Sequence, residues 1–370
     1  MVAMHRICHF VSGDLWAGAE VITFELLKAL NVRPDVDLFV ILLNKGILSN
    51  KLNDVGVATL VLDERRLPFF EIVGTAAKAL KARAPKIFHS HRYKENALAY
   101  LVSLILKNGT ILVSTQHGMP ELYQARQNPL WRLKSQLNFK LLRRKFDKIV
   151  TVSDDIKNSL IEDYGLKETQ VATIRNGIDV PAKCLETAAK QIFVIGSAGR
   201  FVPVKDFSFM VEIAKHVLSE TNGIRFELAG DGPMFREIQN LVIRNGLEKR
   251  VIFRGFVMDM TAFYEGLDLY LNTSLHEGIP MSVLEAMVRG IPTVAPRVGG
   301  LGEIVTDGID GYLIDRRNSR DFAEKCLALY SNETLYRGMA YAAREKIIRQ
   351  FSVERMVAEY FDMYAQMLES

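Results

Sequence analysis

Two glutamates stand eight positions apart in the stretch HEGIPMSVLEA, residues 276–286. We place Pro280 at the first helical position, so that the first backbone N–H groups of the helix lack intrahelical partners and form an anion site. These amides belong to Met281, Ser282 and Val283. Glu277 precedes them and Glu285 follows one turn later, and carboxylates accept hydrogen bonds from sugar hydroxyls. The order acid, amides, acid suits a diphosphate with a sugar on each side, which is a nucleotide-sugar.

A purely structural interpretation of the same stretch is a capped helix whose two acids are solvated. Capping accounts for Glu277, because an acid before a helix interacts favourably with its N-terminus. It gives no role to Glu285, which lies inside the helix. The ligand-binding interpretation explains both residues.

A second stretch, GRFVPVKDF at 199–207, follows an apolar run that is typical of a buried strand. Gly199 lets the backbone turn tightly after this strand, and Arg200 and Lys205 place two cations in the loop. Two cations suit an anion with several oxygens, such as a diphosphate; the alternative is an Arg and a Lys on a solvated loop. The chain contains neither GxGxxG nor GxxxxGK[ST], so neither a nicotinamide enzyme nor a P-loop NTPase is indicated.

Two further strand ends carry residues that could touch the same ligand. Gly230 in AGDGP forms a Gly-rich turn between a strand and a helix, and Phe256 in RGFV follows another strand. Phe256 could hold a nucleobase. Taken singly, a structural turn and a core phenylalanine are the simpler interpretations of these two stretches.

The first half of the chain carries its own candidates. Gly18 in WAGAE lies between the first strand and its helix, where the backbone could approach a phosphate closely. His117 in QHGMP follows the fifth strand at its carboxyl end, where a residue that lines a cleft belongs. His89 and His91 have the spacing of metal ligands, but no third ligand is evident, so we expect them to be structural and expect no metal site.

Buried strands alternate with amphipathic helices in both halves, which indicates parallel sheets covered on both faces. The expected strands are residues 5–11, 37–43, 57–62, 86–91, 110–116, 148–153, 192–199, 224–230, 250–255, 267–274, 291–296 and 310–314. A polar stretch with Gly and Pro, residues 173–191, interrupts the pattern. We therefore predict two doubly wound α/β domains, 1–178 and 179–350, and a C-terminal helix, 351–370.

Composition bounds the class of protein. With 370 residues, 49% hydrophobic and 24% charged, the chain is typical of a globular protein of two domains. We find no apolar run of about eighteen residues and no signal-peptide pattern. The three cysteines form no CxxC pair, which fits buried, reduced thiols. We expect a cytoplasmic protein.

The net charge of +4 is unevenly distributed. Residues 1–176 contain 25 Lys and Arg against 17 Asp and Glu, whereas residues 177–370 contain 22 against 26. The positive first half includes a basic amphipathic segment, residues 128–146, with an apolar face of Leu130, Leu133, Leu137 and Leu141. Such a helix can lie on an anionic membrane, and the alternative is that its apolar face is part of the core.

Taken together and in this order, GRFVPVKDF, AGDGP, VIFRGFV, EGIPMSVLE and VGGLGEIVTDGIDGYLI resemble the group 1 family of glycosyltransferases (family 4, retaining, GT-B fold). The segment that runs from VSDDIKNSL to IRNGID, residues 152–179, resembles it too. The resemblance covers nearly the whole chain. It implies two Rossmann-like domains that face a central cleft, with the C-terminal helix crossing back to the first domain.

The resemblance also implies roles for the candidate residues. Arg200 and Lys205 match the pair that neutralises the donor diphosphate, Glu277 the acid at the donor sugar, and Glu285 the acid at the nucleotide ribose. The amides of Ser282 and Val283 match phosphate donors, and His117 matches the histidine near the donor sugar and the reaction centre. The family usually has Gly-Gly where this chain has Ala17-Gly18, so close approach to a phosphate is expected at Gly18.

The implied reaction moves a sugar from a UDP-sugar or GDP-sugar to an acceptor hydroxyl with retention of configuration, without a metal or resident cofactor. The implied acceptor is a glycan or a lipid-linked glycan of cell-surface polysaccharide, lipopolysaccharide or glycolipid synthesis, and no nucleic acid is expected as a partner. Membrane contact would place the protein at the inner face of the cytoplasmic membrane. The rival interpretations are a nucleotide-sugar epimerase of the same fold and a non-catalytic protein that binds sugar nucleotides.

Overall fold

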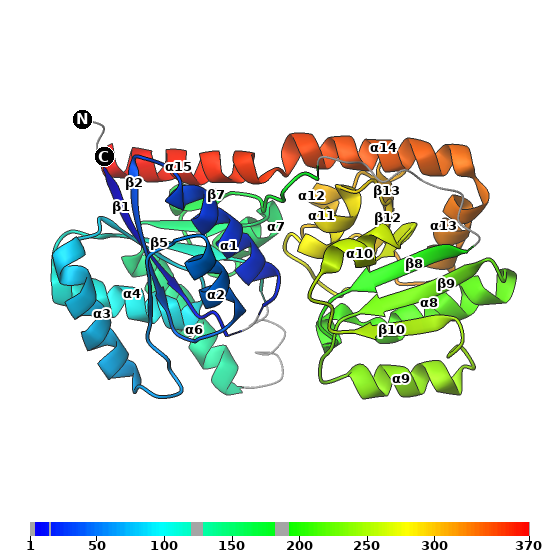
Figure 1. The fold of residues 1–370 in the computed structure, drawn as a ribbon, viewed down its shortest axis with the longest axis horizontal. Helices are drawn as coiled ribbons and strands as arrows, with labels where there is room; N and C mark the ends of the chain where they lie inside the picture. The colour runs from blue at the N-terminus through cyan, green and yellow to red at the C-terminus, as the bar shows by residue number, and fades with distance from the viewer. Residues whose placement is uncertain (1–3, 15, 120–128, 182–191, 370) are drawn as a thin grey trace. The chain divides into compact units, whose positions relative to one another are not determined.

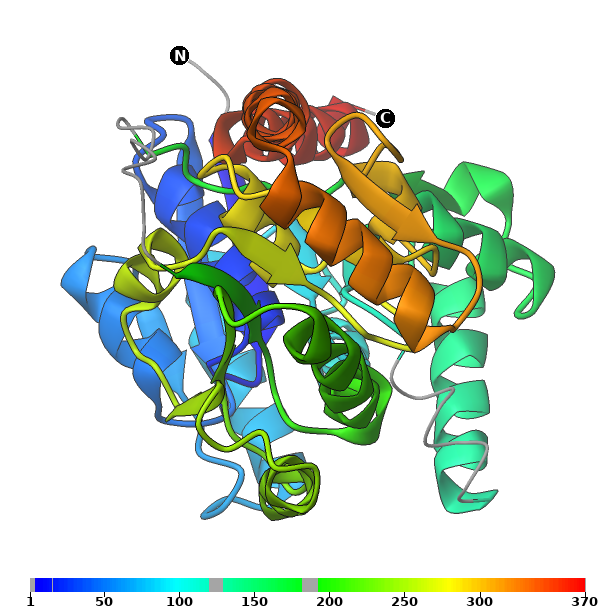
Figure 2. The same cartoon turned by 90° about the vertical axis from the view of Figure 1, so that its right-hand side faces the viewer.

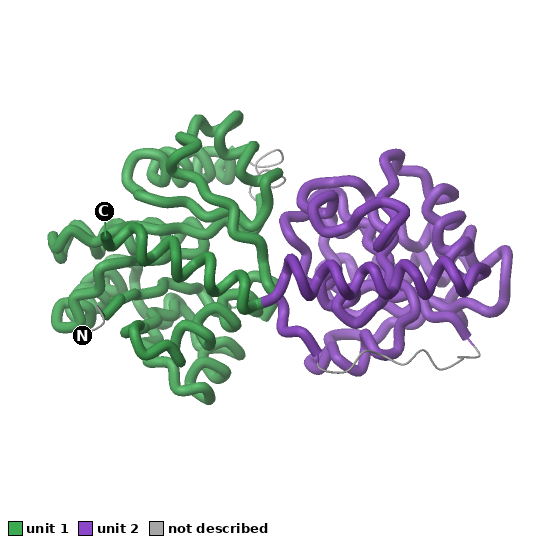
Figure 3. The backbone as a smooth tube through the Cα atoms, turned by 90° about the horizontal axis from the view of Figure 1, so that it is seen from above, with its two compact units in different colours: residues 1–177, 353–370 green, residues 178–352 purple. Residues whose placement is uncertain are grey.

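The structure is a computed structural model that describes residues 4–14, 16–119, 129–181 and 192–369. The chain divides into two compact units, which are coloured separately in Figure 3. Unit 1 comprises residues 1–177 and 353–370, and unit 2 comprises residues 178–352. Most of the predicted linker, residues 182–191, lies outside the described residues, as does Cys184.

Unit 1 is built on a seven-stranded sheet in the order β3-β2-β1-β4-β5-β6-β7, with every neighbouring pair parallel (Figure 1). The strands are β1 His5–Val11, β2 Val36–Leu42, β3 Thr59–Val61, β4 Ile87–Ser90, β5 Ile111–Gln116, β6 Lys148–Thr151 and β7 Val171–Thr173. The first six confirm the prediction. We missed β7 because it has only three residues and leads directly into the polar stretch at 173–191.

The α-helices that the described residues of unit 1 form are α1 Gly18–Asn31, α2 Ile47–Asp54, α3 Phe69–Arg83, α4 Tyr93–Leu106, α6 Pro129–Lys145, α7 Asp154–Glu162 and α15 Val353–Glu369. The C-terminal helix α15 packs on α1 and β1, so the expectation that this helix returns to the first domain is confirmed. Its Phe361 ring contacts the guanidinium of Arg33 at 3.5 Å and the ring of His5 at 5.1 Å. Among the described helices, none combines the length and apolar character needed to span a membrane.

Helix α6 does not bury the row of leucines that we considered as a core face. The side chains that α6 buries are Ser135, Asn138, Phe139 and Leu142. Leu133 and Leu137 are more than half exposed, at 53% and 56%. The core interpretation is therefore wrong for these two leucines.

Unit 2 contains a six-stranded parallel sheet in the order β10-β9-β8-β11-β12-β13. Its strands are β8 Phe193–Ala198, β9 Ile224–Ala229, β10 Val251–Gly255, β11 Leu269–Leu271, β12 Thr293–Pro296 and β13 Gly311–Ile314. Its α-helices are α8 Phe207–Glu220, α9 Phe235–Arg244, α10 Met260–Glu265, α11 Met281–Met287, α12 Leu301–Ile304, α13 Ser319–Ser331 and α14 Glu333–Gln350. Helices α8 and α13 pack side by side over buried strand residues that include Ile195 and Phe226 (Figure 2).

Both sheets have the Rossmann strand order 3-2-1-4-5-6, with one added strand in unit 1. The order reverses next to the first strand, between β1 and β4 in unit 1 and between β8 and β11 in unit 2. Because all strands are parallel, their carboxyl ends share one edge, and ligands of such sheets bind outside that edge at the reversal. In unit 2 this places the loop after β8 beside the loop after β11.

The core of unit 1 contains three histidines, His9 on β1, His89 on β4 and His91 directly after β4. Burial lowers the pKa of His9 to about 3 and lowers the pKa values of His89 and His91 well below the ordinary range. All three imidazoles are therefore neutral in the folded protein at neutral pH.

This neutrality predicts a pH-dependent stability. The unfolded chain protonates His9 near pH 6.5 whereas the folded chain does not, so the free energy of unfolding falls as the pH drops below 6.5, by up to about 2 kcal/mol at pH 5. His9→Asn should lose less stability than wild type between pH 7 and pH 5. Both tryptophans, Trp16 and Trp131, belong to unit 1, so their fluorescence in urea titrations reports its unfolding.

The quantity to compare is the loss of unfolding free energy between pH 7 and pH 5, in wild type and in His9→Asn. The absolute stability of either protein is not needed. The buried carboxyls Glu20 and Glu95, whose pKa values burial raises, change stability in the opposite direction as the pH falls. They titrate in both proteins and cancel in the difference. Equal losses for wild type and His9→Asn would show that His9 is not held neutral.

Candidate active site

An ion pair joins the two loops at the reversal of the unit 2 sheet. Lys205 ends a short 3-10 helix, Pro203–Lys205, between β8 and α8, and Glu277 lies between β11 and α11. The Lys205 Nζ atom lies 2.5 Å from Glu277 Oε1. The structure thus brings together two candidates that are 72 positions apart in the sequence.

The carboxylate of Glu277 is buried and held by more than the lysine. The Ser274 hydroxyl donates to the same oxygen, Oε1, at 2.6 Å, and the Asn272 side-chain amide donates to it at 3.4 Å. The Asn272 amide oxygen in turn accepts from the Ser274 N–H at 2.9 Å. We did not single out Asn272 or Ser274, although both belong to the NTS that directly follows β11.

A second loop holds the backbone around Glu277. Gly299 has a φ of +50°, and a β-carbon there would lie 2.0 Å from the Glu277 carbonyl oxygen. The N–H of Gly300 donates to that same carbonyl at 3.0 Å. A side chain at position 299 would therefore displace the loop that carries Glu277, which gives a physical reason for the paired glycines before α12.

The loop after β8 packs against the loop after β9. The N–H of Gly199 donates to the Ala229 carbonyl at 3.0 Å, and a β-carbon at Gly230 would lie 1.9 Å from the Gly199 carbonyl oxygen. Gly230 also has a φ of +131°, whereas Gly199 has no positive φ. The chain does bend at Gly199, directly after β8, but it is at position 230 that the conformation and the close contact require a glycine.

Arg200 differs from Lys205 in its surroundings. Its side chain is exposed, and its guanidinium forms no hydrogen bond or ion pair with any residue that the structure describes. It lies one residue past Gly199, at the carboxyl edge of the sheet. Of the two predicted cations, one is engaged with Glu277 and the other faces solvent.

The start of α11 corrects one part of the prediction. Helix α11 begins at Met281, so Pro280 precedes the helix and is not its first residue. The Val283 N–H donates to the Pro280 carbonyl at 3.1 Å, so this amide is not unpaired. The first turn of the helix closes one residue earlier than we expected. Of the three predicted amides, those of Met281 and Ser282 come before this first hydrogen bond.

Glu285 is not a solvated surface acid. Its Oε2 atom accepts a hydrogen bond from the Tyr264 hydroxyl at 2.6 Å, and Tyr264 itself is buried. Burial raises the pKa of the Glu285 carboxyl, while the Tyr264 hydrogen bond and the nearby Arg289 oppose that rise. The structural alternative of a solvated glutamate is therefore wrong. Nothing local in the sequence points to Tyr264, which is 21 positions away.

Phe256 is 59% exposed and follows Gly255, which ends β10 with a φ of +66°. The alternative that it is a core residue is wrong. An exposed ring at the carboxyl edge of the sheet is available to stack on a planar group.

Gly18 and His117 belong to unit 1. Gly18 is exposed and is the first residue of α1, after an extended Ala17 that provides no side-chain cap. His117 directly follows β5, and its Nε2 atom lies 3.1 Å from His91 Nδ1. The expectation that His89 and His91 have no third histidine beside them is wrong, because His9 Nδ1 lies 3.0 Å from His91 Nε2.

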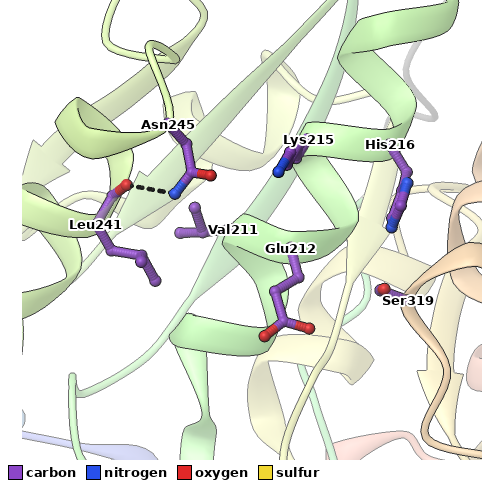
Figure 4. A pocket seen from close by; sticks show the side chains of 7 residues that line it. All are labelled: Val211, Glu212, Lys215, His216, Leu241, Asn245 and Ser319. Carbon is purple, nitrogen blue, oxygen red and sulfur yellow. Dashed lines mark hydrogen bonds between the residues drawn. The ribbon is translucent and has the colours of Figure 1, made fainter.

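Unit 2 also has a hollow of about 350 Å³ among the outer helices (Figure 4). It is lined by Val211, Glu212, Lys215, His216, Leu241, Asn245 and Ser319. The Asn245 side chain donates to the Leu241 carbonyl at 2.8 Å. None of the lining residues is among the candidates at the strand ends, so this hollow is a separate feature.

Comparison with known proteins identifies the family. A family model described as glycosyl transferases group 1 matches residues 192–332, and one described as Glycosyltransferase Family 4 matches residues 16–181. An uncharacterized glycosyltransferase of Methanocaldococcus jannaschii is 30% identical over 269 residues, which is 72% of each chain. The UDP-Gal:alpha-D-GlcNAc-diphosphoundecaprenol alpha-1,3-galactosyltransferase of Escherichia coli is 24% identical and covers 98% of this chain and 97% of its own.

Solved structures share the fold. Anabaena HepE in complex with UDP and glucose has a TM-score of 0.83 and 20% identity, and covers 98% of this chain and 100% of its own. The lipopolysaccharide outer core galactosyltransferase WaaB has a TM-score of 0.73 and 18% identity, and covers 98% and 99%. With the parallel sheets described above, these matches establish the GT-B fold. The chain belongs to the group 1 glycosyltransferases of family 4.

Proposed function

We propose that this glycosyltransferase moves a sugar from a nucleotide diphosphate sugar to an acceptor hydroxyl, with retention of configuration and without a metal ion. The observation that carries the proposal is the Lys205–Glu277 ion pair at the β8/β11 reversal of unit 2. It combines a cation for a phosphate with a buried acceptor for sugar hydroxyls at the edge where such sheets bind ligands.

The leaving group is a nucleoside diphosphate, and its developing charge is the main barrier that the site must lower. Arg200 and Lys205 supply positive charge, and the amides of Met281 and Ser282 supply further donors. Fixed donors aimed at charge that develops in the transition state usually make the largest catalytic contribution. In this scheme the two side chains replace the charge that a metal ion would otherwise supply.

Retention can arise from a same-face reaction or from a double displacement, and the state of Glu277 bears on the choice between them. Three donors on its Oε1 stabilise the carboxylate and weaken it as a nucleophile. This favours a same-face reaction over a double displacement. The acceptor oxygen attacks the anomeric carbon, the bond to the leaving diphosphate breaks, and a phosphate oxygen takes the acceptor's proton. Glu277 binds the transferred sugar and takes no part in bond formation.

Glu285 and Phe256 are assigned to the nucleoside. The half-buried carboxylate of Glu285, which already accepts from Tyr264, can also accept from ribose hydroxyls, and the exposed Phe256 ring can stack on the base. A UDP-sugar or GDP-sugar is the proposed donor. The structures of Anabaena HepE with UDP and with UDP-glucose support the uridine alternative by analogy of fold.

The proposed acceptor is a glycan or lipid-linked glycan of a surface polymer; the Escherichia coli relative is named for an acceptor of this kind, a GlcNAc-diphosphoundecaprenol. Contact with an anionic membrane is part of the proposal. Exposed Leu133 and Leu137 alternate on α6 with lysines and arginines, and Ile105 on the adjacent helix α4 is 55% exposed. Apolar side chains flanked by cations are typical of helices that lie on anionic lipid.

The first prediction concerns the leaving diphosphate. Lys205→Ala should lower transferase turnover at least about tenfold, because it removes a charge from the transition state. The measurement is release of nucleoside diphosphate from UDP-sugars and GDP-sugars with a mixed acceptor pool. Lys215→Ala, which removes an exposed lysine from α8 in the same unit, should keep wild-type turnover. Unchanged turnover in Lys205→Ala would remove this lysine from the site.

The second prediction concerns the ribose. Wild type should bind UDP at least about tenfold more tightly than 2′,3′-dideoxy-UDP, because the half-buried Glu285 carboxylate loses its hydroxyl partners in the analogue. Glu285→Gln should lose most of this preference, whereas Glu265→Gln, at an exposed position beside Tyr264, should keep it. Calorimetric titration measures both affinities. A preference that persists in Glu285→Gln would assign the ribose elsewhere.

The third prediction concerns the membrane. Wild type should co-sediment with vesicles rich in phosphatidylglycerol, and less so at high salt, which screens the basic helix. Leu133→Ser combined with Leu137→Ser should reduce co-sedimentation severalfold without a loss of thermal stability, because both side chains are exposed. Tyr341→Ser is a control at an exposed position of α14 in unit 2. Equal binding by all three proteins would exclude α6 as the contact.

A further inference from the structure

A line of hydrogen-bonded side chains runs through the core of unit 1 from His117 to helix α15. His117 Nε2 lies 3.1 Å from His91 Nδ1, and His91 Nε2 lies 3.0 Å from His9 Nδ1. His9 Nε2 lies 3.5 Å from the Tyr364 hydroxyl on α15. Each imidazole in this half of the line uses one nitrogen toward each neighbour.

The line continues beyond Tyr364. Its hydroxyl lies 2.5 Å from His89 Nδ1, and His89 Nε2 lies 2.8 Å from the Thr115 hydroxyl. Thr115 lies 3.0 Å from the hydroxyl of Tyr360, which is the last member. We call these seven residues the histidine relay: His117, His91, His9, Tyr364, His89, Thr115 and Tyr360.

Sheet register explains why these residues meet. His9 on β1 is paired with His89 on β4, and His89 is paired with Val113 on β5. Positions two apart on a strand share a face, so His91, Thr115 and His117 lie on the face of the sheet that carries His9 and His89. Tyr360 and Tyr364 are one helical turn apart on α15, and both are buried.

Because the imidazoles are neutral, all hydrogen bonds of the histidine relay are donated in the same direction along the line. Burial lowers the pKa of His117 to about 3, as it does for His9, so these imidazoles are neutral at neutral pH. A neutral imidazole has one N–H and one accepting nitrogen, and a hydroxyl donates one hydrogen. Every histidine of the relay therefore has its proton on the same nitrogen, either Nδ1 throughout or Nε2 throughout.

The hydrogen-bond partners of Tyr360 indicate in which of the two directions the hydrogen bonds are donated. Tyr360 is buried, and Thr115 is the one hydrogen-bond partner of its hydroxyl among the described residues. If the relay ran toward Tyr360, the phenol hydrogen would be buried without a partner, which is costly. If Tyr360 donates to Thr115, the one polar atom of the line left without a partner among the described residues is His117 Nδ1, whereas in the opposite direction both the Tyr360 hydrogen and His117 Nδ1 would lack one.

We propose that the histidine relay holds His117 as the Nδ1–H tautomer, so that this residue presents one neutral hydrogen-bond donor to a ligand oxygen. His117 Nδ1 is buried and has no partner among the described residues, as an atom that awaits a ligand would. The other members are positioning residues. The identity of the ligand rests on the proposed function, because a substrate of the sugar transfer would supply the oxygen that His117 binds.

A metal ion shared by His9, His89 and His91 is the alternative use of these residues, since their nitrogens lie within 4.8 Å of one another. The relative orientation of the imidazole rings is evidence against such a metal site. His89 and His91 are stacked with an interplanar angle of 13° and centroids 4.6 Å apart, so their lone pairs run parallel and do not converge on one ion. Their nitrogens are also engaged in the relay.

The decisive measurement is the tautomeric state of the histidines by long-range ¹⁵N–¹H NMR of histidine-labelled protein at neutral pH. Of the seven histidines in the chain, the four in the relay should all show the Nδ1–H pattern. An Nε2–H pattern or a mixture at His117 would overturn the proposal. Stoichiometric zinc binding that shifts the His9, His89 and His91 signals together would also overturn it, in favour of a metal site.

Two matched variants on the same helix test the effect on function. Tyr364→Phe removes the hydroxyl between His89 and His9, so His117 should lose its uniform tautomer. Turnover should fall about tenfold, the low end of what removing the partner of a functional histidine costs at metal sites. Tyr360→Phe removes an equally buried hydroxyl at the far end. The tautomers should persist, because Thr115 then becomes the end member, and among the described residues its hydroxyl hydrogen has an acceptor, His89 Nε2, in the same direction only.

The readouts separate failure of this proposal from failure of the proposed function. UDP affinity, which the proposed function assigns to unit 2, should be unchanged in both variants. Nδ1–H tautomers in a protein that transfers no sugar would support the relay and reject the function. Equal loss of turnover in both variants, with His117 unchanged in its tautomer, would reject the relay and keep the function.

Discussion

A single ion pair, Lys205 Nζ with Glu277 Oε1, is the contact that joins the two loops of the candidate site in unit 2. A charged pair removed from water is tolerated only when further hydrogen bonds satisfy it, and Ser274 and Asn272 supply these. Gly299 lets a neighbouring loop approach the Glu277 backbone closely. The parallel order of the strands brings these loops to one edge, so the fold and the candidate site follow from the same geometric constraint.

The core of unit 1 contains buried polar side chains, which need hydrogen-bond partners inside the protein. Neutral histidines in a core are acceptable because each donates once and accepts once, so His91 and His9 leave no polar atom without a partner. The atom that remains open is His117 Nδ1, at the carboxyl edge of the sheet. The C-terminal helix α15 supplies both tyrosines of the relay, which gives its return to unit 1 a chemical role as well as a packing role.

The sequence contained enough to predict every strand of both sheets except β7, because buried parallel strands are apolar runs that Gly and Pro bound. It also placed Lys205 and Glu277 in loops at strand ends. Three features escaped prediction for physical reasons. The Val283 amide bonds to Pro280 because the turn closes one residue earlier than expected. Tyr264 meets Glu285, and His9 meets His91, through tertiary packing and strand register, which local spacing does not encode.

The central claim is that unit 2 binds a nucleotide diphosphate sugar through the Lys205–Glu277 site. A ligand that binds the folded state raises the melting temperature, and the rise is larger the more the ligand concentration exceeds its Kd. A thermal-shift panel of nucleotide-sugars tests the claim most directly, with wild type and Glu277→Gln measured side by side. The account predicts that one UDP-sugar or GDP-sugar stabilises wild type strongly and stabilises Glu277→Gln clearly less. A panel in which no nucleotide-sugar stabilises wild type, or in which Glu277→Gln responds equally, would contradict it.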